Sequence, residues 1–290
     1  MTVLLTGSTG FLGSYLLKYF VNAGYKVIAL KRTTSDTYRI DKYLDRVTTY
    51  NVDTINVNMI FNKHQIDIVI NTVTNYGRKD TNISSIIDTN LMFGLKVLEA
   101  SIDARVRAFI NTDTLLERNI NTYSLSKAQL VDWMQFLSNK NTKIINVKIE
   151  HMYGPLDDEN KFIYWLINQL KQNIDQIDLT SGIQKRDFIY IEDIVSAYNT
   201  IIENIEKLSN YEEFELGAGE SIEVKTFIEK IYSELSNKQS LSTKLNFGAI
   251  AYRENENMNM IANIEKLKQL GWAPKTSIEN GIKNILNGES

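Results

Sequence analysis

The residues of this sequence that are best placed to do chemistry are a tyrosine and a lysine four positions apart. Tyr123 and Lys127 lie in the stretch TYSLSKAQ, and the residues that follow have helical spacing. On a helix, positions i and i+4 share one face, so the phenol and the ammonium would lie side by side. The positive charge would lower the pKa of the tyrosine, which is about 10 for a free side chain. We therefore expect Tyr123 to exchange a proton with a carbonyl or hydroxyl oxygen.

A glycine-rich turn near the N-terminus begins the fold that must position this pair. An apolar strand is predicted at 2–6, a helix from residue 11 to about residue 23, and a second strand at 26–30. In the turn GSTGFLG, one glycine permits a tight turn, one lets a pyrophosphate approach and one lets the helix pack closely. A dinucleotide is therefore expected to bind the residues Gly7, Ser8, Thr9, Gly10, Phe11, Leu12 and Gly13.

The end of the second strand selects between the two nicotinamide cofactors. An acid at this place would bind the ribose 2′-OH of NAD, whereas an arginine accommodates the 2′-phosphate of NADP. The sequence has Lys31 and Arg32 here, and the first acid is Asp36. Since both cations could pair with a phosphate, we predict NADP(H), with NAD(H) as the alternative.

Strand and helix patterns alternate through the first 150 residues. This alternation predicts an α/β fold, with a Rossmann-type doubly wound parallel sheet over residues 1–150. Beyond it the alternation loosens, and we expect residues 151–290 to form mainly a smaller, mixed α/β substrate lobe. Ligands of such sheets bind at the carboxyl ends of the strands. The candidates at or just beyond those ends, or in the segments that follow them, are Asp53, Thr72, Val73, Thr74, Asn90, Thr112 and Thr114.

The spacing Tyr-x-x-x-Lys occurs a second time, at Tyr38 and Lys42. Because the chain has 15 tyrosines, chance alone would give about one such pair. Context separates the two pairs. Tyr123 begins a helix after the predicted strand 107–112, beside the expected nicotinamide site, while Tyr38 follows the second strand in the adenosine region. We predict that Tyr123 and Lys127 are catalytic and that Tyr38 is an ordinary surface residue.

Composition argues against several classes of function. The net charge is −3 with no basic block, which argues against nucleic-acid binding. The chain has no cysteine and two histidines, so thiolate sites and disulfides are excluded and no metal site is predicted. The N-terminus lacks the pattern of a signal peptide, and no apolar segment is long enough to span a membrane. We expect a cytoplasmic protein with no membrane partner.

The motifs together resemble the short-chain dehydrogenase/reductase family. The turn G-x-x-G-x-x-G with a later Tyr-x-x-x-Lys is similar to that family, and the length suggests its extended branch, also called the NAD-dependent epimerase/dehydratase family. Further stretches resemble it along nearly the whole chain, among them IDIVINTVT, DTNLMFGLKVLEAS, HMYGP, KRDFIYIEDIVSAY and YRENEN. Within the family, the chain resembles nucleotide-sugar 4-ketoreductases of the CDP-abequose synthase type.

The resemblance implies further site residues and an arrangement of the lobes. It places Asn90 with the cofactor, and it implies a nucleotide-sugar site that includes Tyr76, Tyr153, Arg186 and Arg253. The two arginines would bind the diphosphate. Family members have interleaved lobes, so a return of the chain to the first domain is expected near 187–205. Their helices that correspond to 83–104 and 122–138 pair into a dimer interface, which implies a homodimer.

The implied reaction is NADPH-dependent reduction of the 4-keto group of a nucleoside-diphosphate 4-keto-6-deoxy sugar. Tyr123 would be the general acid, and Thr112 or Thr114 would hydrogen-bond the carbonyl oxygen; the sequence leaves open which of the two. Asp113 is followed by Thr114 instead of glutamate, which argues against a sugar dehydratase. The alternatives are an NAD-dependent 4-epimerase that uses the same residues and a non-catalytic protein that senses NADP.

Overall fold

The chain forms two compact units in a computed structural model that describes residues 1–77, 82–138, 141–254 and 256–288. Unit 1 comprises Met1–Ile149 and Tyr198–Glu215, and unit 2 comprises Glu150–Ala197 and Leu216–Ser290. The two units therefore interleave along the chain. The segment that returns to unit 1 is 198–215, later than the range near 187–205 that we predicted.

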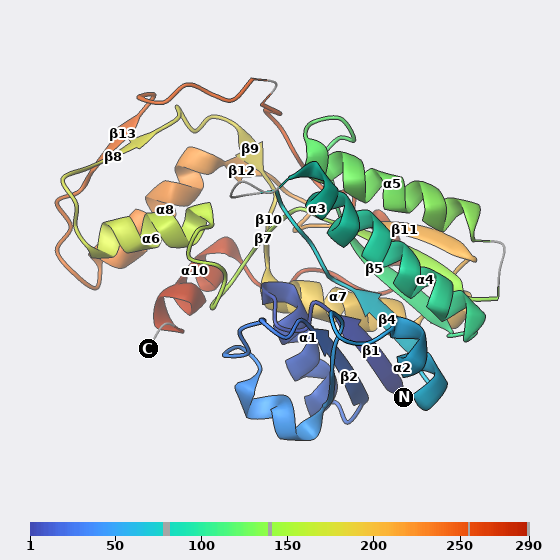
Figure 1. The fold of residues 1–290 in the computed structure, drawn as a ribbon. Helices are drawn as coiled ribbons and strands as arrows, with labels where there is room; N and C mark the ends of the chain where they lie inside the picture. Colours follow the sequence, from blue (N-terminus) through green and yellow to red (C-terminus); the bar gives the residue numbers. More distant parts are fainter. Residues whose placement is uncertain (78–81, 139–140, 255, 289–290) are drawn as a thin grey trace. The chain divides into compact units, whose positions relative to one another are not determined.

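Unit 1 is built on a seven-stranded sheet with the order β11-β6-β5-β4-β1-β2-β3 (Figure 1). The pairings of β1 with β2 and β4, of β2 with β3, and of β5 with β4 and β6 are parallel. This arrangement confirms the predicted doubly wound sheet. The strands are β1 Thr2–Thr6, β2 Lys26–Lys31, β3 Thr48–Asn51, β4 Ile68–Asn71, β5 Ala108–Thr114, β6 Lys143–Ile149 and β11 Tyr211–Leu216.

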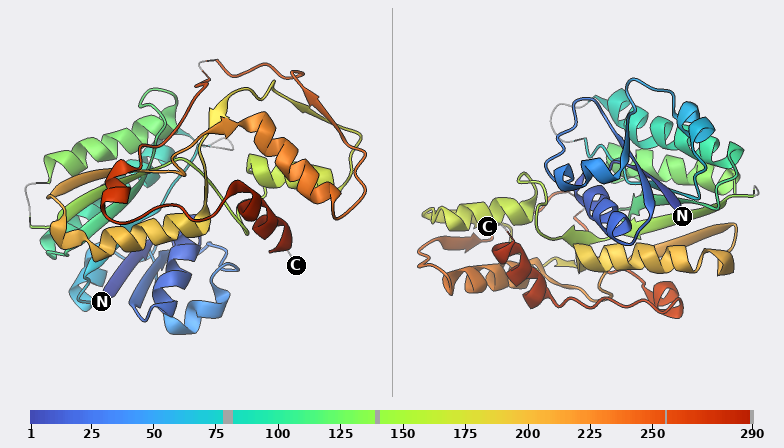
Figure 2. Two further views of the ribbon diagram at one scale, coloured as in Figure 1. Left: turned by 180° about the vertical axis from the view of Figure 1, so that it is seen from behind. Right: turned by 90° about the horizontal axis from the view of Figure 1, so that it is seen from below.

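Helices cover both faces of this sheet (Figure 2). On one face lie α2 Val57–Lys63, α4 Gly94–Asp103 and α5 Thr122–Phe136, whose apolar side chains pack on Leu4, Phe109 and Ile144. The helix α1 Phe11–Asn22 and residues 198–203 of α7 Ile191–Glu203 belong to the other face. Short 3₁₀ turns η1 Asp41–Arg46 and η3 Ile205–Lys207 complete the unit.

The helix that we expected over 83–104 is divided into three segments. These are α3 Ile83–Ile87, a π-helical segment η2 Asp88–Phe93 and α4 Gly94–Asp103. Single π-helical turns inside an α-helix are frequent at functional sites. Here the segment contains Asn90, whose side chain is turned into the protein and 1% exposed.

Unit 2 is held by three two-stranded sheets and an aromatic core. Its strands are β7 His151–Tyr153, β8 Gln176–Leu179, β9 Lys185–Arg186, β10 Phe188–Tyr190, β12 Ile222–Glu223 and β13 Lys244–Phe247. Its helices are α6 Phe162–Lys171, α8 Val224–Ser236, α9 Glu265–Gln269, α10 Ile278–Asn287 and residues 191–197 of α7. In the core, the rings of Phe188 and Phe227 stack with centroids 3.9 Å apart.

Asp187 lies between β9 and β10. The side chain of this residue is fully buried, and its carboxylate accepts the backbone N–H groups of Ala218, Gly219 and Ala262. Burial raises the pKa of Asp187, while the three N–H groups act in the opposite direction. The carboxylate therefore ties three loop segments of unit 2 together. Within the described part of the chain, no helix is both long and apolar enough to cross a membrane.

Candidate active site

The glycine-rich turn forms a cradle that side chains would fill. Gly7 has φ of 64°, and a Cβ there would lie 2.7 Å from Thr72 Oγ1. A Cβ on Gly13 would lie 2.1 Å from the carbonyl oxygen of Gly7. Gly10 is the N-cap of α1 and supplies no side-chain cap, so backbone N–H groups and the positive end of the helix dipole remain at this turn. The residues present therefore fit the pyrophosphate of a dinucleotide.

The other predicted residues of this turn differ in which of their atoms could contact a cofactor. Ser8 is fully buried and its hydroxyl donates to the carbonyl of Leu30, 3.0 Å away, so this side chain fastens the turn to β2. Phe11 and Leu12 are buried on the inner side of α1. These three residues can offer the cofactor only their backbone, whereas Thr9 is partly exposed.

The end of β2 carries the two predicted cations and a third that sequence analysis missed. Lys31 Nζ donates to Asn51 Oδ1 at 3.0 Å, and Arg32 is exposed. Arg39 Nη1 donates to the backbone carbonyl of Thr9 at 3.3 Å, and its guanidinium lies 4.7 Å from the centroid of the Tyr38 ring. Three cations thus lie at the end of β2 or in the loop after it, and Arg39 lies against the glycine-rich turn. The signal in the sequence was the accumulation of positive charge after the second strand.

Asp53 holds the loop after β2 in place. Its two carboxylate oxygens accept the backbone N–H of Thr33 at 2.9 and 3.1 Å. This hydrogen bond is the main cause that holds the pKa of Asp53 below its ordinary value. In this structure Asp53 joins the end of β3 to the loop after β2, and a direct contact with the cofactor stays a prediction.

The turn after β4 is fastened to the end of β1 and, through Asn90, to α5. Thr72 Oγ1 donates to the carbonyl of Thr6 at 2.7 Å, while Val73 and Thr74 are partly exposed beyond it. Asn90 donates both amide hydrogens inside the protein, to the Asn75 carbonyl and to Ser126 Oγ, each at 2.9 Å. Its Oδ1 accepts the N–H of Asn75 at 2.7 Å. The geometry favours a positioning role for Asn90, and its direct contact with the cofactor stays a prediction.

The tyrosine and lysine lie at the start of α5, as predicted. The helix begins with a capping box, in which Asn121 Oδ1 accepts the N–H of Ser124 at 2.9 Å and Ser124 Oγ accepts the N–H of Asn121 at 3.2 Å. This cap places Tyr123 in the first turn. Lys127 is 1% exposed and its Nζ donates to the carbonyl oxygen of Thr112 at 2.5 Å. Burial lowers the pKa of Lys127, and the charge of Asp113 opposes that shift.

Tyr76 packs against the candidate acid. The centroids of its ring and the Tyr123 ring are 5.1 Å apart, and Tyr76 is 38% exposed. Aromatic rings at this separation attract each other and restrict each other's rotation. Tyr76 was predicted to bind substrate, and the structure places it beside the phenol that would do the chemistry.

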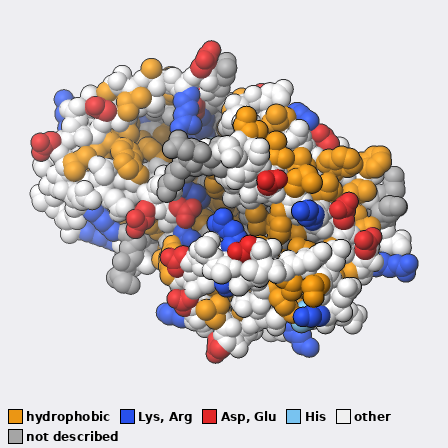
Figure 3. Space-filling model, viewed as in Figure 1, with side chains coloured by type: hydrophobic (Ala, Val, Ile, Leu, Met, Phe, Trp, Pro, Cys, Tyr) orange, Lys and Arg blue, Asp and Glu red, His pale blue; other side chains and the backbone are white. Residues whose placement is uncertain are grey.

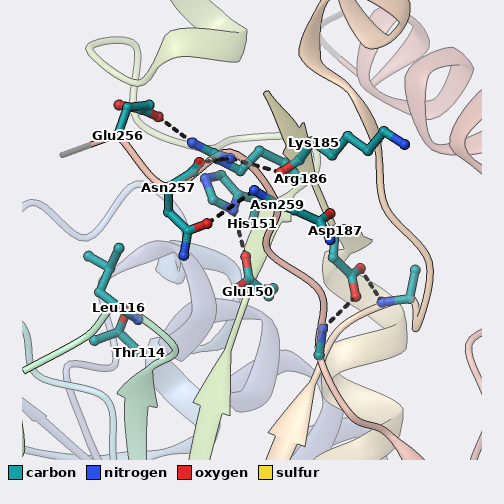
Figure 4. Close-up of polar contacts among 12 residues, drawn as sticks. Thr114, Leu116, Glu150, His151, Lys185, Arg186, Asp187, Glu256, Asn257 and Asn259 are labelled. Carbon is teal, nitrogen blue, oxygen red and sulfur yellow. Dashed lines mark hydrogen bonds and ion pairs between the residues drawn. The ribbon is translucent and has the colours of Figure 1, made fainter. Parts of the chain in front are cut away.

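The two candidate threonines have different surroundings. The Thr112 hydroxyl is buried and lies 2.6 Å from the hydroxyl of Tyr198, itself fully buried, with a pKa that burial raises. Thr114, the last residue of β5, is partly exposed, and its Oγ1 accepts the N–H of Leu116 at 3.2 Å (Figure 4). The geometry therefore favours Thr114 as the hydroxyl that meets a substrate, while Thr112 serves Lys127 through its backbone.

In unit 2, Arg186 forms an ion pair and hydrogen bonds with a loop segment. The guanidinium is buried, forms an ion pair with Glu256 and donates to the carbonyls of Asn257 and Lys185 at 2.7 and 2.8 Å (Figure 4). Arg253, three residues before Glu256, is exposed, and its backbone carbonyl accepts the N–H of Glu256 at 3.2 Å. The structure thus brings Arg186 to the segment that contains Arg253, and the diphosphate contacts of both stay predictions.

Tyr153 belongs to the aromatic core of unit 2. It is 1% exposed, and its ring contacts those of Phe188, Tyr190 and Phe227 with centroids 5.5 to 6.4 Å apart. A Cβ on Gly281 would lie 2.2 Å from the Tyr153 hydroxyl, so the helix α10 approaches it closely. This burial favours packing over the substrate contact that we expected, because the side chain presents almost no surface to a ligand.

Comparison with known proteins agrees with this geometry. A model of the NAD dependent epimerase/dehydratase family matches residues 3–217. The CDP-abequose synthase of Salmonella muenchen is 33% identical over 293 residues, which cover 98% of this chain and 97% of that protein. Among solved structures, the UDP-glucose 4-epimerase of Thermotoga maritima with UDP-glucose has a TM-score of 0.81 and 21% identity, covering 100% of this chain and 98% of its own.

A second solved structure is similar, the UDP-glucuronic acid 4-epimerase of Bacillus cereus in complex with UDP-glucuronic acid and NAD. Its TM-score is 0.82 at 20% identity, and the match covers 99% of this chain and 98% of that one. At these identities the two structures show a shared fold. Because the family model spans most of the chain and the synthase matches it nearly end to end, this protein belongs to the NAD dependent epimerase/dehydratase family and is an NAD(P)-dependent oxidoreductase of the extended short-chain dehydrogenase/reductase type.

Proposed function

We propose that this protein reduces the 4-keto group of a nucleoside-diphosphate 4-keto-6-deoxy sugar with NADP(H). The observation that carries the proposal is the buried contact between Lys127 Nζ and the Thr112 carbonyl, one helical turn from Tyr123. This contact holds the lysine against β5, near whose carboxyl end ligands of such sheets bind, and Tyr123 is four residues before it on α5. The match to a CDP-abequose synthase supports a sugar nucleotide as substrate and a CDP-linked sugar as the first to test.

In the proposed reaction, three residues of unit 1 have different roles. A bound nicotinamide cofactor supplies the hydride. Tyr123 donates a proton to the oxygen of the carbonyl as negative charge develops there. Lys127 stabilises that charge and the phenolate that remains, since it lies one turn further along the same helix. Thr114 donates a hydrogen bond to the same oxygen, which stabilises the charge more in the transition state than in the ground state.

The choice of cofactor rests on charge at the end of β2. Lys31 and Arg32 stand where a carboxylate would select NAD, and Arg39 adds a third cation against the glycine-rich turn. A 2′-phosphate carries negative charge with which Lys31 and Arg32 would pair, whereas the 2′-OH of NAD offers them no charge. We therefore favour NADP(H) over NAD(H).

Three residues are proposed to bind the substrate. Tyr76 would contact the sugar, because it is exposed and packs on Tyr123. Arg186 and Arg253 would bind the diphosphate. For Arg186 this requires the phosphate to compete with Glu256, because the Glu256 carboxylate forms an ion pair with the guanidinium in this structure.

A turnover assay tests the proposed function directly. The protein is mixed with NADPH or NADH and a panel of nucleoside-diphosphate 4-keto-6-deoxy sugars, CDP-linked first, and the absorbance of the reduced nicotinamide is followed. Stoichiometric oxidation with one sugar is the expected result, and it names substrate and cofactor together. Interconversion of a sugar nucleotide without net cofactor oxidation would identify a 4-epimerase instead. Cofactor binding with no turnover of any sugar would identify a sensor.

A homodimer is proposed from the outer surface of α5. Trp133 and Phe136 are 46% and 74% exposed, and their rings meet edge to face with centroids 6.1 Å apart. Hydrophobic side chains gather over α4 and α5 (Figure 3). Sedimentation at micromolar concentration is expected to give twice the monomer mass, and Phe136→Lys is expected to shift it toward the monomer. A monomeric mass for the unmodified chain would contradict the proposal.

A further inference from the structure

A row of polar side chains crosses the central sheet of unit 1. Its members come from four neighbouring strands and are register partners: Thr6 of β1, Asn71 of β4, Asn111 of β5 and Asn146 of β6. All four are at most 1% exposed. Successive side chains are joined by hydrogen bonds of 2.7, 2.9 and 2.9 Å. The row is therefore a continuous chain of hydrogen-bonded side chains inside the core of unit 1.

The row lies on the sheet face that α4 and α5 cover. Side chains alternate between the two faces of a strand, and the residues two positions before each asparagine, Val69, Phe109 and Ile144, pack in the core cluster with α4 and α5. Asp113 is two positions after Asn111 and shares that face. Thr112 faces the other side, where its hydroxyl meets Tyr198.

The direction of the chain is fixed at its Asp113 end. Asn146 Nδ2 donates to Asp113 Oδ2 at 2.9 Å and to Glu213 Oε2 at 3.3 Å. A carboxylate only accepts hydrogen bonds, so the amide nitrogen of Asn146 must face the carboxylates and its oxygen must face Asn111. The same reasoning passes from one asparagine to the next, back to Thr6. Every donor therefore points toward the carboxylates, and aligned bonds of this kind polarise one another.

The two carboxylates at the end of the row meet different cations. Glu213 pairs with Lys148 at 2.5 Å, and both side chains are about 30% exposed. Asp113 is 7% exposed and directly follows Thr112, the residue whose carbonyl holds Lys127 Nζ. The charge of Asp113 acts on Lys127 and opposes the effect of burial on its pKa. Each of the two carboxylates thus balances a different cation. Glu213 balances Lys148, and Asp113 balances Lys127.

We propose that Asp113 is a positioning residue for catalysis, which Asn146 fixes so that its negative charge balances the buried ammonium of Lys127. The inference rests on the proposed function only in assigning Lys127 a catalytic role. An isolated ammonium in the protein interior tends to lose its proton. With Asp113 present, Lys127 stays a cation beside Tyr123 at the pH at which the enzyme works.

The titratable groups placed next to the Lys127 ammonium by the described contacts are Tyr123, one turn before it on α5, and Asp113, which follows its hydrogen-bond acceptor Thr112 on β5. Tyr198 reaches the Thr112 hydroxyl from the other face of the sheet. Burial raises the pKa of Tyr198, so it carries no charge near neutral pH, and Asp113 supplies the local negative charge. Without that charge the pKa of Lys127 falls, and the ammonium loses its proton at lower pH.

The test compares Asp113→Asn with Glu213→Gln. Both changes remove one negative charge and keep an acceptor for Asn146 Nδ2, but only the first removes the charge that borders Lys127. The pKa of Lys127 is measured from its ¹³Cε resonance through a pH titration of the full chain, with the resonance assigned by its absence in Lys127→Arg. A fall of about one pH unit or more is expected for Asp113→Asn, and less than half that fall for Glu213→Gln. If Asp113→Asn folds poorly, Asp113→Ser replaces it.

An unchanged Lys127 pKa in the Asp113 variant, or an equal fall in both variants, would overturn the proposal. In turnover, the alkaline limb of kcat should move to lower pH by the same amount in the Asp113 variant alone. The NMR measurement needs no substrate, so it decides the role of Asp113 even if the panel of sugars gives no turnover. A failed turnover assay with the expected NMR shift would reject the proposed function and keep the charge pair.

Discussion

Lys127 in unit 1 and Arg186 in unit 2 are both buried cations, but they are satisfied in different ways. Lys127 donates to a backbone carbonyl, and the acid that balances it is held in place by an asparagine. Arg186 pairs directly with the carboxylate of Glu256 and adds two backbone carbonyls. The lysine is thus placed to act on a neighbouring phenol, whereas the arginine already has the anion that a substrate phosphate would replace. The difference predicts that Lys127 controls the chemical step and Arg186 controls binding and stability.

The largest expected effect is on the chemical step. Lys127→Met is expected to lower kcat by about a hundredfold or more, since it removes the charge that supports general acid catalysis. Lys42→Met is the matched control, because Lys42 follows Tyr38 at the same spacing. Steady-state kinetics with the substrate found in the panel measures both. A large loss in the Lys42 variant would mean that the wrong tyrosine–lysine pair had been assigned.

The role of Arg186 is tested by measuring the free energy of unfolding. Arg186→Met leaves the Glu256 carboxylate without its partner and is expected to cost about 3 kcal/mol of unfolding free energy. The double variant Arg186→Met with Glu256→Gln should recover much of that loss, because no unpaired charge remains. Denaturant unfolding followed by circular dichroism measures the cost. Equal losses in the single and double variants would show that packing of the arginine, and not charge, is what matters.

A smaller effect is expected at the exposed cations after β2. Lys31→Ala together with Arg32→Ala should raise the KM for NADPH about tenfold or more and leave the KM for NADH nearly unchanged, because only NADPH carries the 2′-phosphate. The ratio of the two values is the measurement. If both rise equally, these cations support the loop and do not select the cofactor.

The smallest effect is expected at Asp53. The pKa of this carboxylate lies below its ordinary value, mainly because the Thr33 N–H donates to it. Such a group stabilises the fold above its unfolded pKa of about 4, and the contribution is lost as pH falls through the folded pKa. Asp53→Asn should therefore lower Tm slightly at pH 7, and the difference should vanish near about pH 2. A difference that persists at low pH would point to lost shape instead of lost charge.

Local patterns predicted the elements of unit 1 better than those of unit 2. The strands predicted at 2–6 and 26–30 are found at Thr2–Thr6 and Lys26–Lys31, and the helix predicted from residue 11 to about residue 23 is found at Phe11–Asn22. Short strands such as β7, β12 and β13 were missed, because two to four residues carry too little periodicity to be recognised. The π-helical segment around Asn90 was missed because its cause is tertiary, an amide that reaches Asn75 and Ser126.

The sequence by itself determined the candidate chemistry and the sheet that positions it. The glycine spacing, the Tyr-x-x-x-Lys pair and the strand–helix alternation are local patterns with local physical causes. Tertiary structure alone decided that the Thr112 hydroxyl is buried against Tyr198, 86 residues away, while Thr114 is partly exposed. It also decided that Tyr153 is core, that Arg39 meets the glycine-rich turn, and that Asp113 lies at the end of a chain of asparagines. These contacts join strands that are distant in sequence, and side-chain alternation gives the face of a residue but not its partner.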